Sequence, residues 1–347
     1  MQNDMNDIKI HYPNIAQSAL IWGLFFLICF GLGYPSVNRY DPRERLTDVR
    51  RYYALVTGSP ADLHERFRYR VLIPYLAKPI YSLVNGRTKS WNPVFFSLLV
   101  VNSVFVASSA LMIIILGLKL LGDFSVALIG ALLYLLNMNM PIGHLGGLID
   151  SGEGFFLLAV VLGISFDRWT LLPLLGIFGA LAKETFVPLS VSFLLVYWLT
   201  DSYHNKFNFS KLLLIVSLLL TSIITVVTLQ SVISGHMIYP WDIIRAERSD
   251  VSLLTGFINC ITGQTFWYVF IWLLPLGLIR LNYFPTPLVY ASLASALTAL
   301  FLGSWNNSLG NVARGMFNIM GPLLNLSIAF MIINKPLFSG KRKKAYK

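Results

Sequence analysis

The sequence predicts an all-α bundle of helices that crosses a membrane about ten times. Hydrophobic residues make up 56% of the chain and charged residues only 12%, whereas about a quarter of the residues in a soluble domain are charged. The apolar residues gather in long runs, and the polar residues gather in a few segments too short to form a soluble domain. We therefore expect one transmembrane domain over residues 1–347.

Ten apolar runs predict the membrane-spanning helices, because a helix needs roughly 20 apolar residues, or about 17 at least, to cross a bilayer. The first run is too long for a signal-peptide core and lacks a small-residue cleavage site, so we expect it to be retained as a span. The expected spans lie near residues 15–34, 93–121, 124–141, 152–166, 169–182, 185–200, 211–234, 266–280, 285–303 and 318–334.

A further apolar stretch, residues 71–84, carries Pro74, Lys78 and Pro79. We interpret it as an interfacial or re-entrant helix rather than a span. The basic tail that follows Lys335 predicts a cytoplasmic C-terminus, because lysine and arginine near span ends favour the cytoplasm. Ten spans then place the N-terminus on the cytoplasmic side as well.

Eight arginines lie in residues 36–71, which we call the arginine-rich segment. With ten spans, 12 basic residues face the cytoplasm and 15 face outward, which opposes the usual orientation rule. However, nine of the inner 12 are lysine and 12 of the outer 15 are arginine. Because arginine can form two parallel hydrogen bonds with a phosphate or carboxylate group, we expect the outer face to carry the functional site. Lipid phosphates, rather than nucleic acid, are the expected counter-charges for a net charge of +11.

The arginine-rich segment also has a simpler interpretation. Its arginines and acids could pair with one another on the surface, above anionic headgroups. If residues 71–84 crossed the membrane, the number of spans before the tail would be odd and the segment would be cytoplasmic. Both alternatives remain open at the level of the sequence.

Four more polar clusters fall on the expected outer side. They are His144 to Asp150 with Glu153, the pair Lys183 and Glu184, the loop around Trp241, and residues 304–318 with Arg314. Ionisable groups near a membrane core persist where they pair, line water or serve a ligand. Structural interpretations stand beside the functional ones: Asp150 could cap a helix, and Lys183–Glu184 could be an interfacial turn.

The order of several motifs resembles the bacterial integral-membrane glycosyltransferases of the GT-C superfamily, in particular its small members. The motifs are Asp48-x-x-x-Tyr52-Tyr53, Tyr69-Arg70-x-Leu72-x-Pro74, Asp150 at the opening of a span, and Leu181-Ala182-Lys183-Glu184-Thr185, with a weaker echo in Ala313-Arg314 before Pro322. The likeness covers residues 15–200, including an outer loop at 35–92. It leaves residues 201–347 as C-terminal helices and a basic cytoplasmic tail.

This resemblance implies transfer of a sugar from a polyprenyl-phosphate carrier to a lipid or glycan acceptor on the non-cytoplasmic face of a bacterial inner membrane. It implies that Asp48 corresponds to the catalytic base and Asp150 to the second acidic position. Glu184 completes the candidate catalytic acids. Two features depart from the family: the chain is short and lacks the usual C-terminal soluble domain, and Asn311 stands where some relatives carry an acid.

The residue types also suit this chemistry independently of the resemblance. One carboxylate must take a proton from the attacking hydroxyl, and Asp48 is our candidate for this base. Phosphate charge on the leaving group needs fixed donors, for which Arg68, Arg70, Lys183 and Arg314 are candidates. Tyr52, Tyr53 and His144 complete the expected substrate-binding residues.

A divalent metal held by His144 or His64 with Asp48 or Asp150 is a second interpretation, so the cofactor stays undetermined. A lone histidine beside a carboxylate is more often a hydrogen-bonded structural residue. The sequence contains no HExxH, P-loop, CxxC or nucleophile-elbow motif, which disfavours zinc proteolysis, ATP hydrolysis and serine hydrolysis. The competing functions are a transporter or flippase for lipid-linked saccharides, a polymerase of such saccharides, and a non-catalytic scaffold.

Overall fold

The computed structural model describes residues 12–38, 47–58, 68–87, 91–204, 208–246, 249–307 and 309–334. Every regular element within these ranges is helical, which confirms the all-α fold class. Six of the helices are long and apolar enough to cross a membrane, or seven if the bent pair Gln264–Phe270 and Leu273–Tyr283 is one span. The described residues therefore form a multi-pass helical bundle, with fewer full-length spans than the ten expected.

All ten expected spans are nevertheless helical. The six long helices are α1 (Ile15–Asn38), α6 (Pro93–Leu121), α10 (Phe186–His204), α11 (Phe209–Ser234), α16 (Thr286–Trp305) and α17 (Leu309–Ile333). The other expected spans are α7 (Phe124–Leu136), α8 (Asp150–Ser165), α9 (Leu172–Ala182) and the pair α14 (Gln264–Phe270) and α15 (Leu273–Leu278). The difference lies in the length of these shorter helices, which pack inside or beside the bundle.

Two helix boundaries and one additional helix correct the expectations from the sequence. α7 ends at Leu136, five residues early, because the chain turns at Asn137 into a π-helix over Met140–His144. α17 begins at Leu309, nine residues early, so Arg314 lies within a helix and not in a loop. The arginine-rich segment is not wholly a loop, since it contains helix α3 (Thr47–Thr57).

Residues 71–84 form the helix α5 (Leu72–Val84), which has 13 residues and is too short to cross a bilayer. One face of α5 buries Ile73 and Ala77, and the other exposes Tyr75, Leu76 and Leu83. A short helix with one exposed apolar face is typical of the membrane interface. The stretch is thus a helix too short for a span, and its interfacial position stays a prediction.

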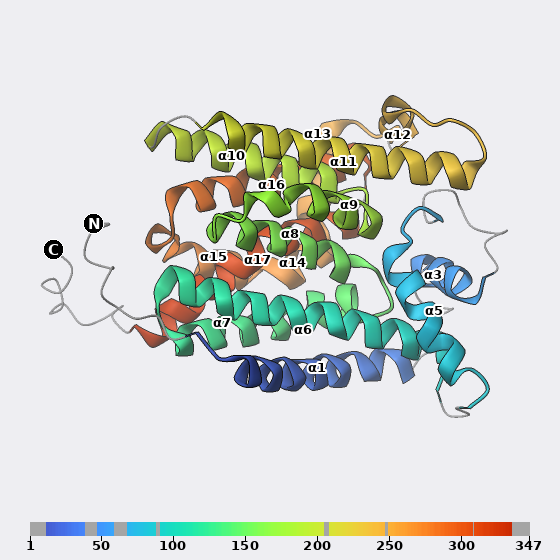
Figure 1. Ribbon diagram of the computed structural model, residues 1–347, viewed down its shortest axis with the longest axis horizontal. Helices are drawn as coiled ribbons and strands as arrows, with labels where there is room; N and C mark the ends of the chain where they lie inside the picture. The colour runs from blue at the N-terminus through green and yellow to red at the C-terminus, as the bar shows by residue number, and fades with distance from the viewer. Residues whose placement is uncertain are drawn as a thin grey trace, which may run out of the picture.

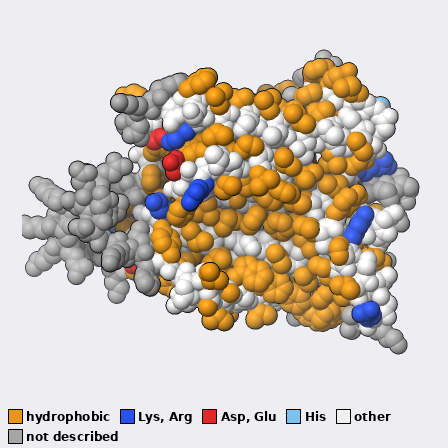
Figure 2. All heavy atoms as spheres, viewed as in Figure 1, with side chains coloured by type: hydrophobic (Ala, Val, Ile, Leu, Met, Phe, Trp, Pro, Cys, Tyr) orange, Lys and Arg blue, Asp and Glu red, His pale blue; other side chains and the backbone are white. Residues whose placement is uncertain are grey.

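The long helices run side by side, and the molecule has two distinct ends (Figure 1). The start of α1 and the end of α17 lie at one end, whereas α3, α5 and α12 (Pro240–Ala246) lie at the other. Between the ends, Figure 2 shows a broad hydrophobic surface, with lysine and arginine near both ends. Leu24 on α1 and Leu220 on α11 are among the exposed apolar side chains, as expected of helices that face lipid.

Close helix packing in the interior depends on small residues. A Cβ atom at Gly117 of α6 would lie 2.8 Å from the Ala127 Cβ of α7 and 2.8 Å from the Leu326 Cδ2 of α17. Glycine at this position therefore lets three helices approach one another, as small residues do in membrane bundles. The resulting core extends along α6, α8 and α17 and holds α8 between its neighbours.

Candidate functional site

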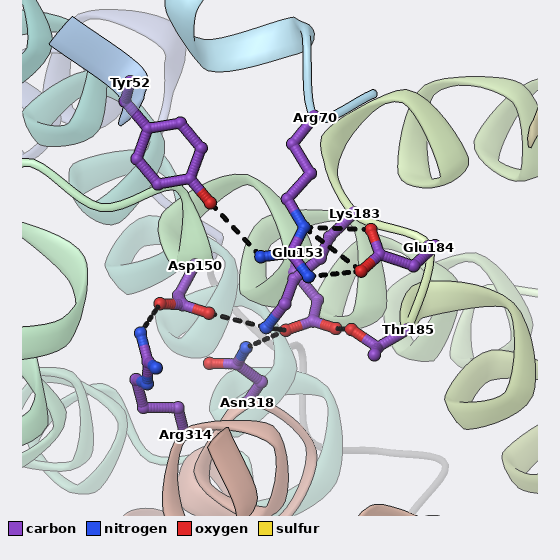
Figure 3. A network of polar contacts seen from close by, with 9 residues as sticks. All are labelled: Tyr52, Arg70, Asp150, Glu153, Lys183, Glu184, Thr185, Arg314 and Asn318. Carbon is purple, nitrogen blue, oxygen red and sulfur yellow. Dashed lines mark hydrogen bonds and ion pairs between the residues drawn. The ribbon is translucent and has the colours of Figure 1, made fainter. Parts of the chain in front are cut away.

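A network of buried charged side chains lies at the end of the bundle that carries α3 and α5 (Figure 3). We call it the ion network. It consists of three cations, Arg70, Lys183 and Arg314, and three carboxylates, Asp150, Glu153 and Glu184, joined by Tyr52, Thr185 and Asn318. The formal charges of its six ionised members cancel.

Helix α8 supplies two of the carboxylates. Asp150 is its first residue and Glu153 lies three residues later, so that both side chains share one face of the helix. Asp150 does not cap α8: Ile149 occupies the cap position. Instead, one oxygen of Asp150 accepts from Lys183 Nζ at 2.7 Å and the other from Arg314 Nη1 at 2.5 Å.

The turn between α9 and α10 supplies the next two charges. Lys183 ends α9 in an extended conformation, and its ammonium group donates to Glu153 Oε2 at 3.1 Å as well as to Asp150. Thr185 donates to the other oxygen of Glu153. The pair Lys183–Glu184 is thus an interhelical turn, as its structural interpretation proposed, and both of its side chains form buried or partly buried ion pairs.

Helix α17 closes the ion network from the opposite side. Arg314 and Asn318 are four residues apart and therefore lie one helical turn from each other. Arg314 binds Asp150, and Asn318 donates to Glu153 Oε2 at 3.0 Å. The early start of α17 is what makes Arg314 helical and places it against α8, one turn before Asn318.

Arg70 connects the arginine-rich segment to the bundle. Its Nε atom donates to both carboxylate oxygens of Glu184, at 3.1 and 3.0 Å, and its Nη2 atom contacts the same carboxylate. Its Nη1 atom donates to the Tyr52 hydroxyl of α3 at 3.2 Å. Burial alone would raise the pKa of Glu184, but the adjacent Arg70 holds this pKa below its usual value, so the pair is ionised at neutral pH.

Such a network is costly to bury and is strongly interdependent. Removing a charge from water carries a desolvation penalty that only well-placed partners offset. Here Asp150 and Glu153 share Lys183, so that loss of any one of these groups would leave a buried charge uncompensated. The arrangement fixes two guanidinium groups and one ammonium group at one end of the bundle.

The structure brings together six of the ten predicted site residues: Tyr52, Arg70, Asp150, Lys183, Glu184 and Arg314. His144 is buried close to them, where its imidazole interacts with Asp150, Arg314 and the Asn318 side chain. Tyr53 instead packs against Phe95 at a ring-centroid distance of 5.5 Å. Arg68 is partly buried, two residues before Arg70.

Asp48, the predicted base, lies in the first turn of α3, four residues before Tyr52. Its side chain is outside the described part of the structure. The described residues contain no group of three or more His, Cys, Asp or Glu arranged to hold a metal ion. His64, invoked in the metal interpretation, also lies outside the described residues.

The sequence analysis left Glu153, Thr185 and Asn318 out of its site residues. The spacing of two of them could have indicated the site. Glu153 follows Asp150 by three residues and Asn318 follows Arg314 by four, which places each pair on one face of a helix. Comparison with family models, with curated proteins and with solved structures finds no match to this chain. The functional argument therefore depends on the residues and their geometry.

Proposed function

We propose that this chain is a membrane glycosyltransferase of the GT-C type, which moves a sugar from a polyprenyl-phosphate donor to a lipid or glycan acceptor. The observation that supports the proposal is the ion network, which fixes Arg70, Lys183 and Arg314 at one end of a membrane bundle. Fixed cations in a water-poor site stabilise phosphate charge as it develops on a leaving group.

The carboxylates of the ion network have a different role from that of a base. Asp150 accepts from two cations and Glu184 is paired with Arg70. A carboxylate whose charge is so compensated is a weak proton acceptor. We therefore assign Asp150 and Glu184 to the positioning of Lys183, Arg314 and Arg70, and we retain Asp48 as the proposed general base.

Helix α3 supports this choice of base by its position. Tyr52 of α3 contacts Arg70 directly, and residue 48 lies one turn earlier on the same helix. The proposed base thus belongs to the same helix as the tyrosine that binds Arg70. In the reaction, the acceptor hydroxyl loses its proton to Asp48 and attacks the anomeric carbon, while the bond to the carrier phosphate breaks.

The test is sugar transfer in proteoliposomes that contain polyprenyl phosphates loaded with radiolabelled sugars. Asp48→Asn should lower transfer about 100-fold or more, since general-base catalysis contributes 10²–10⁴-fold. Asp62→Asn is the matched control, because Asp62 lies in the same segment but outside the motifs. Unchanged transfer by the Asp48 variant would refute the assignment of the base.

The same proteoliposomes separate the proposed reaction from transport. A flippase moves its lipid-linked saccharide across the bilayer without forming a glycosidic bond, and its ionisable groups line a path through the membrane. Figure 1 shows α3 and α5 at one end of the bundle. The ion network includes Tyr52 of α3 and Arg70, just before α5, which favours chemistry at one face. Movement of the labelled lipid with no new glycosidic product would support the transporter instead.

A further inference from the structure

Among the described residues, the ion network has no surplus of positive charge. Its three cations are paired with three carboxylates, so that the formal charges cancel. A phosphate that joined these groups without displacing any of them would bring a fourth anion among them, and like charges repel strongly where little water screens them. One carboxylate must therefore give way if the network is to take up a phosphate.

Two of the three carboxylates are held too firmly to give way. The side chains of Asp150 and Glu153 are 2% and 0% exposed. Asp150 accepts from Lys183 and Arg314, and Glu153 accepts from three side chains. Displacement of either carboxylate would deprive several buried donors of their partner at once, which carries a large desolvation penalty.

Glu184 differs from the other two carboxylates in both respects. Its side chain is 19% exposed. It lies in the turn between α9 and α10, and within the described structure the side-chain donors to its carboxylate all belong to Arg70. Glu184 can therefore turn toward solvent with the loss of a single partner residue.

Arg70 requires an anion beside it. Its side chain is 12% exposed, and a charge that is mostly buried and uncompensated is strongly destabilising. Glu184 can thus leave only as another anion arrives. A phosphate ester suits this exchange, because a guanidinium group forms two parallel hydrogen bonds with a phosphate as it does with a carboxylate.

We propose that Glu184 is a resident counter-anion, which occupies the phosphate site on Arg70 and is displaced when a phosphate ester binds. The choice of a phosphate ester rests on the proposed glycosyl transfer, in which the carrier leaves as a phosphate monoester. In the resting protein Glu184 positions Arg70, and it yields this place to the phosphate. The Nη1 atom of Arg70, which donates to Tyr52 of α3 at 3.2 Å, takes no part in the exchange.

Binding of methyl phosphate tests the proposal, with the full chain in dodecyl maltoside, a detergent without phosphorus, and with line broadening in phosphorus NMR as the readout. Glu184→Gln removes the competing charge and keeps the shape of the side chain. It should tighten binding about tenfold or more, because a site that its own carboxylate fills for about nine-tenths of the time binds its ligand more weakly by that factor. A purely structural role for Glu184 predicts weaker binding instead.

Thermal unfolding gives a second readout. Without phosphate, Glu184→Gln should unfold at a lower temperature than the wild type, since Arg70 has lost its anion. Methyl phosphate at an equal concentration should raise the midpoint of the variant by more than that of the wild type, because a ligand stabilises more the more tightly it binds. If the glutamine variant does not fold, Glu184→Asp, whose carboxylate is set back by one methylene group, tests the exchange in the same direction.

Two further variants are controls. Arg70→Gln, combined with Glu184→Gln, removes the guanidinium group and should abolish the gain in binding. Asp201→Asn is the matched control, because Asp201 pairs with Lys211 at 3.3 Å and its side chain is 22% exposed, close to the 19% of Glu184. It should leave the binding of methyl phosphate unchanged. An equal gain in this variant would show that any released cation attracts phosphate, and would overturn the proposal.

The outcomes separate the exchange from the reaction. Tighter binding of methyl phosphate by Glu184→Gln, in a protein without transferase activity, would uphold the exchange and refute the proposed reaction. Equal or weaker binding by the glutamine variant would overturn the exchange, as would the absence of binding to both proteins. Sugar transfer in proteoliposomes then decides the reaction independently.

Discussion

At the scale of single residues, Lys183 has the most demanding position in the chain. Its ammonium group is almost completely buried and lies between Asp150 at 2.7 Å and Glu153 at 3.1 Å. Because the described cations and carboxylates of the ion network balance, each one is stable only while its partners are present. This interdependence distinguishes a charge network from a set of separable surface ion pairs, each of which contributes little.

Substitution of Lys183 tests this interdependence. Lys183→Met should destabilise the fold by about 3–5 kcal/mol, because it leaves a buried carboxylate uncompensated. The double variant Lys183→Met/Glu153→Gln should recover part of this loss, since the second change removes the unpaired charge. Thermal unfolding in nanodiscs measures both variants. A double variant as unstable as the single one, or less stable, would show that the two charges are not coupled.

The residues of the ion network were largely predictable from the sequence, but their partners were not. Asp150, Lys183, Glu184, Arg70 and Arg314 each stood out as charges beside apolar runs. Pairing depends on how the helices pack, which no local pattern encodes. Glu153 was noticed only as part of a cluster, although its spacing from Asp150 places it on the same face of a helix.

At the scale of helices, the apolar runs predicted where helices occur better than where they end. α17 begins nine residues before the expected span. The hydropathy pattern missed this start because the first turns of the helix carry Asn311 and Arg314, which make the segment as polar as a loop. A helix whose polar side chains face a buried ion network has the same average hydropathy as an exposed polar segment. The short helices α7 and α9 were overestimated as spans for a different reason, since an apolar run does not show where a helix stops: α7 ends at the turn at Asn137 although the apolar run continues.

Helix packing makes a prediction about glycines at contrasting positions. Gly117→Ala on α6 would place a methyl group 2.8 Å from Ala127 Cβ and from Leu326 Cδ2, so that α6, α7 and α17 must move apart. We expect a loss of about 1–3 kcal/mol of stability. Gly31→Ala on α1 meets no atom within 4 Å, and should be neutral or stabilise the helix by up to about 1 kcal/mol.

Both glycine variants are compared by thermal unfolding in the same nanodiscs, with helix content checked by circular dichroism. The comparison controls for the change in helix propensity, which is identical at the two positions. Equal midpoints for the two variants would contradict the close approach of the three helices at Gly117.

At the scale of the whole molecule, the two ends of the bundle differ in kind. One end carries the ion network with its paired arginines, and the other carries Lys211 over Trp169 and Lys119 over Phe166 without such a network among the described residues; a lysine over an aromatic ring also occurs at the first end, as Lys78 over Tyr75. Lysine near the ends of spans favours the cytoplasm. The assignment of these two ends to the two faces of the membrane stays a prediction.

This contrast leads to a prediction of orientation. Arg87 follows α5 at the end with the ion network, and Asn334 follows α17 at the opposite end; both are exposed. We expect Arg87→Cys to react with a membrane-impermeant maleimide from the outside of intact cells, and Asn334→Cys to react only after the membrane is opened. The two native cysteines, Cys29 and Cys260, are buried, so that the wild-type chain is the unlabelled control.

The labelling pattern separates two parts of the argument. Labelling of both variants from the same side would show that the ends of the bundle do not lie on opposite faces of the membrane. Opposite sides in the reverse order, with Arg87→Cys protected in intact cells, would place the ion network in the cytoplasm. A donor handled there would have to be loaded on the cytoplasmic leaflet, and the assignment of sugar transfer to the outer face would fall while the ion network itself remained.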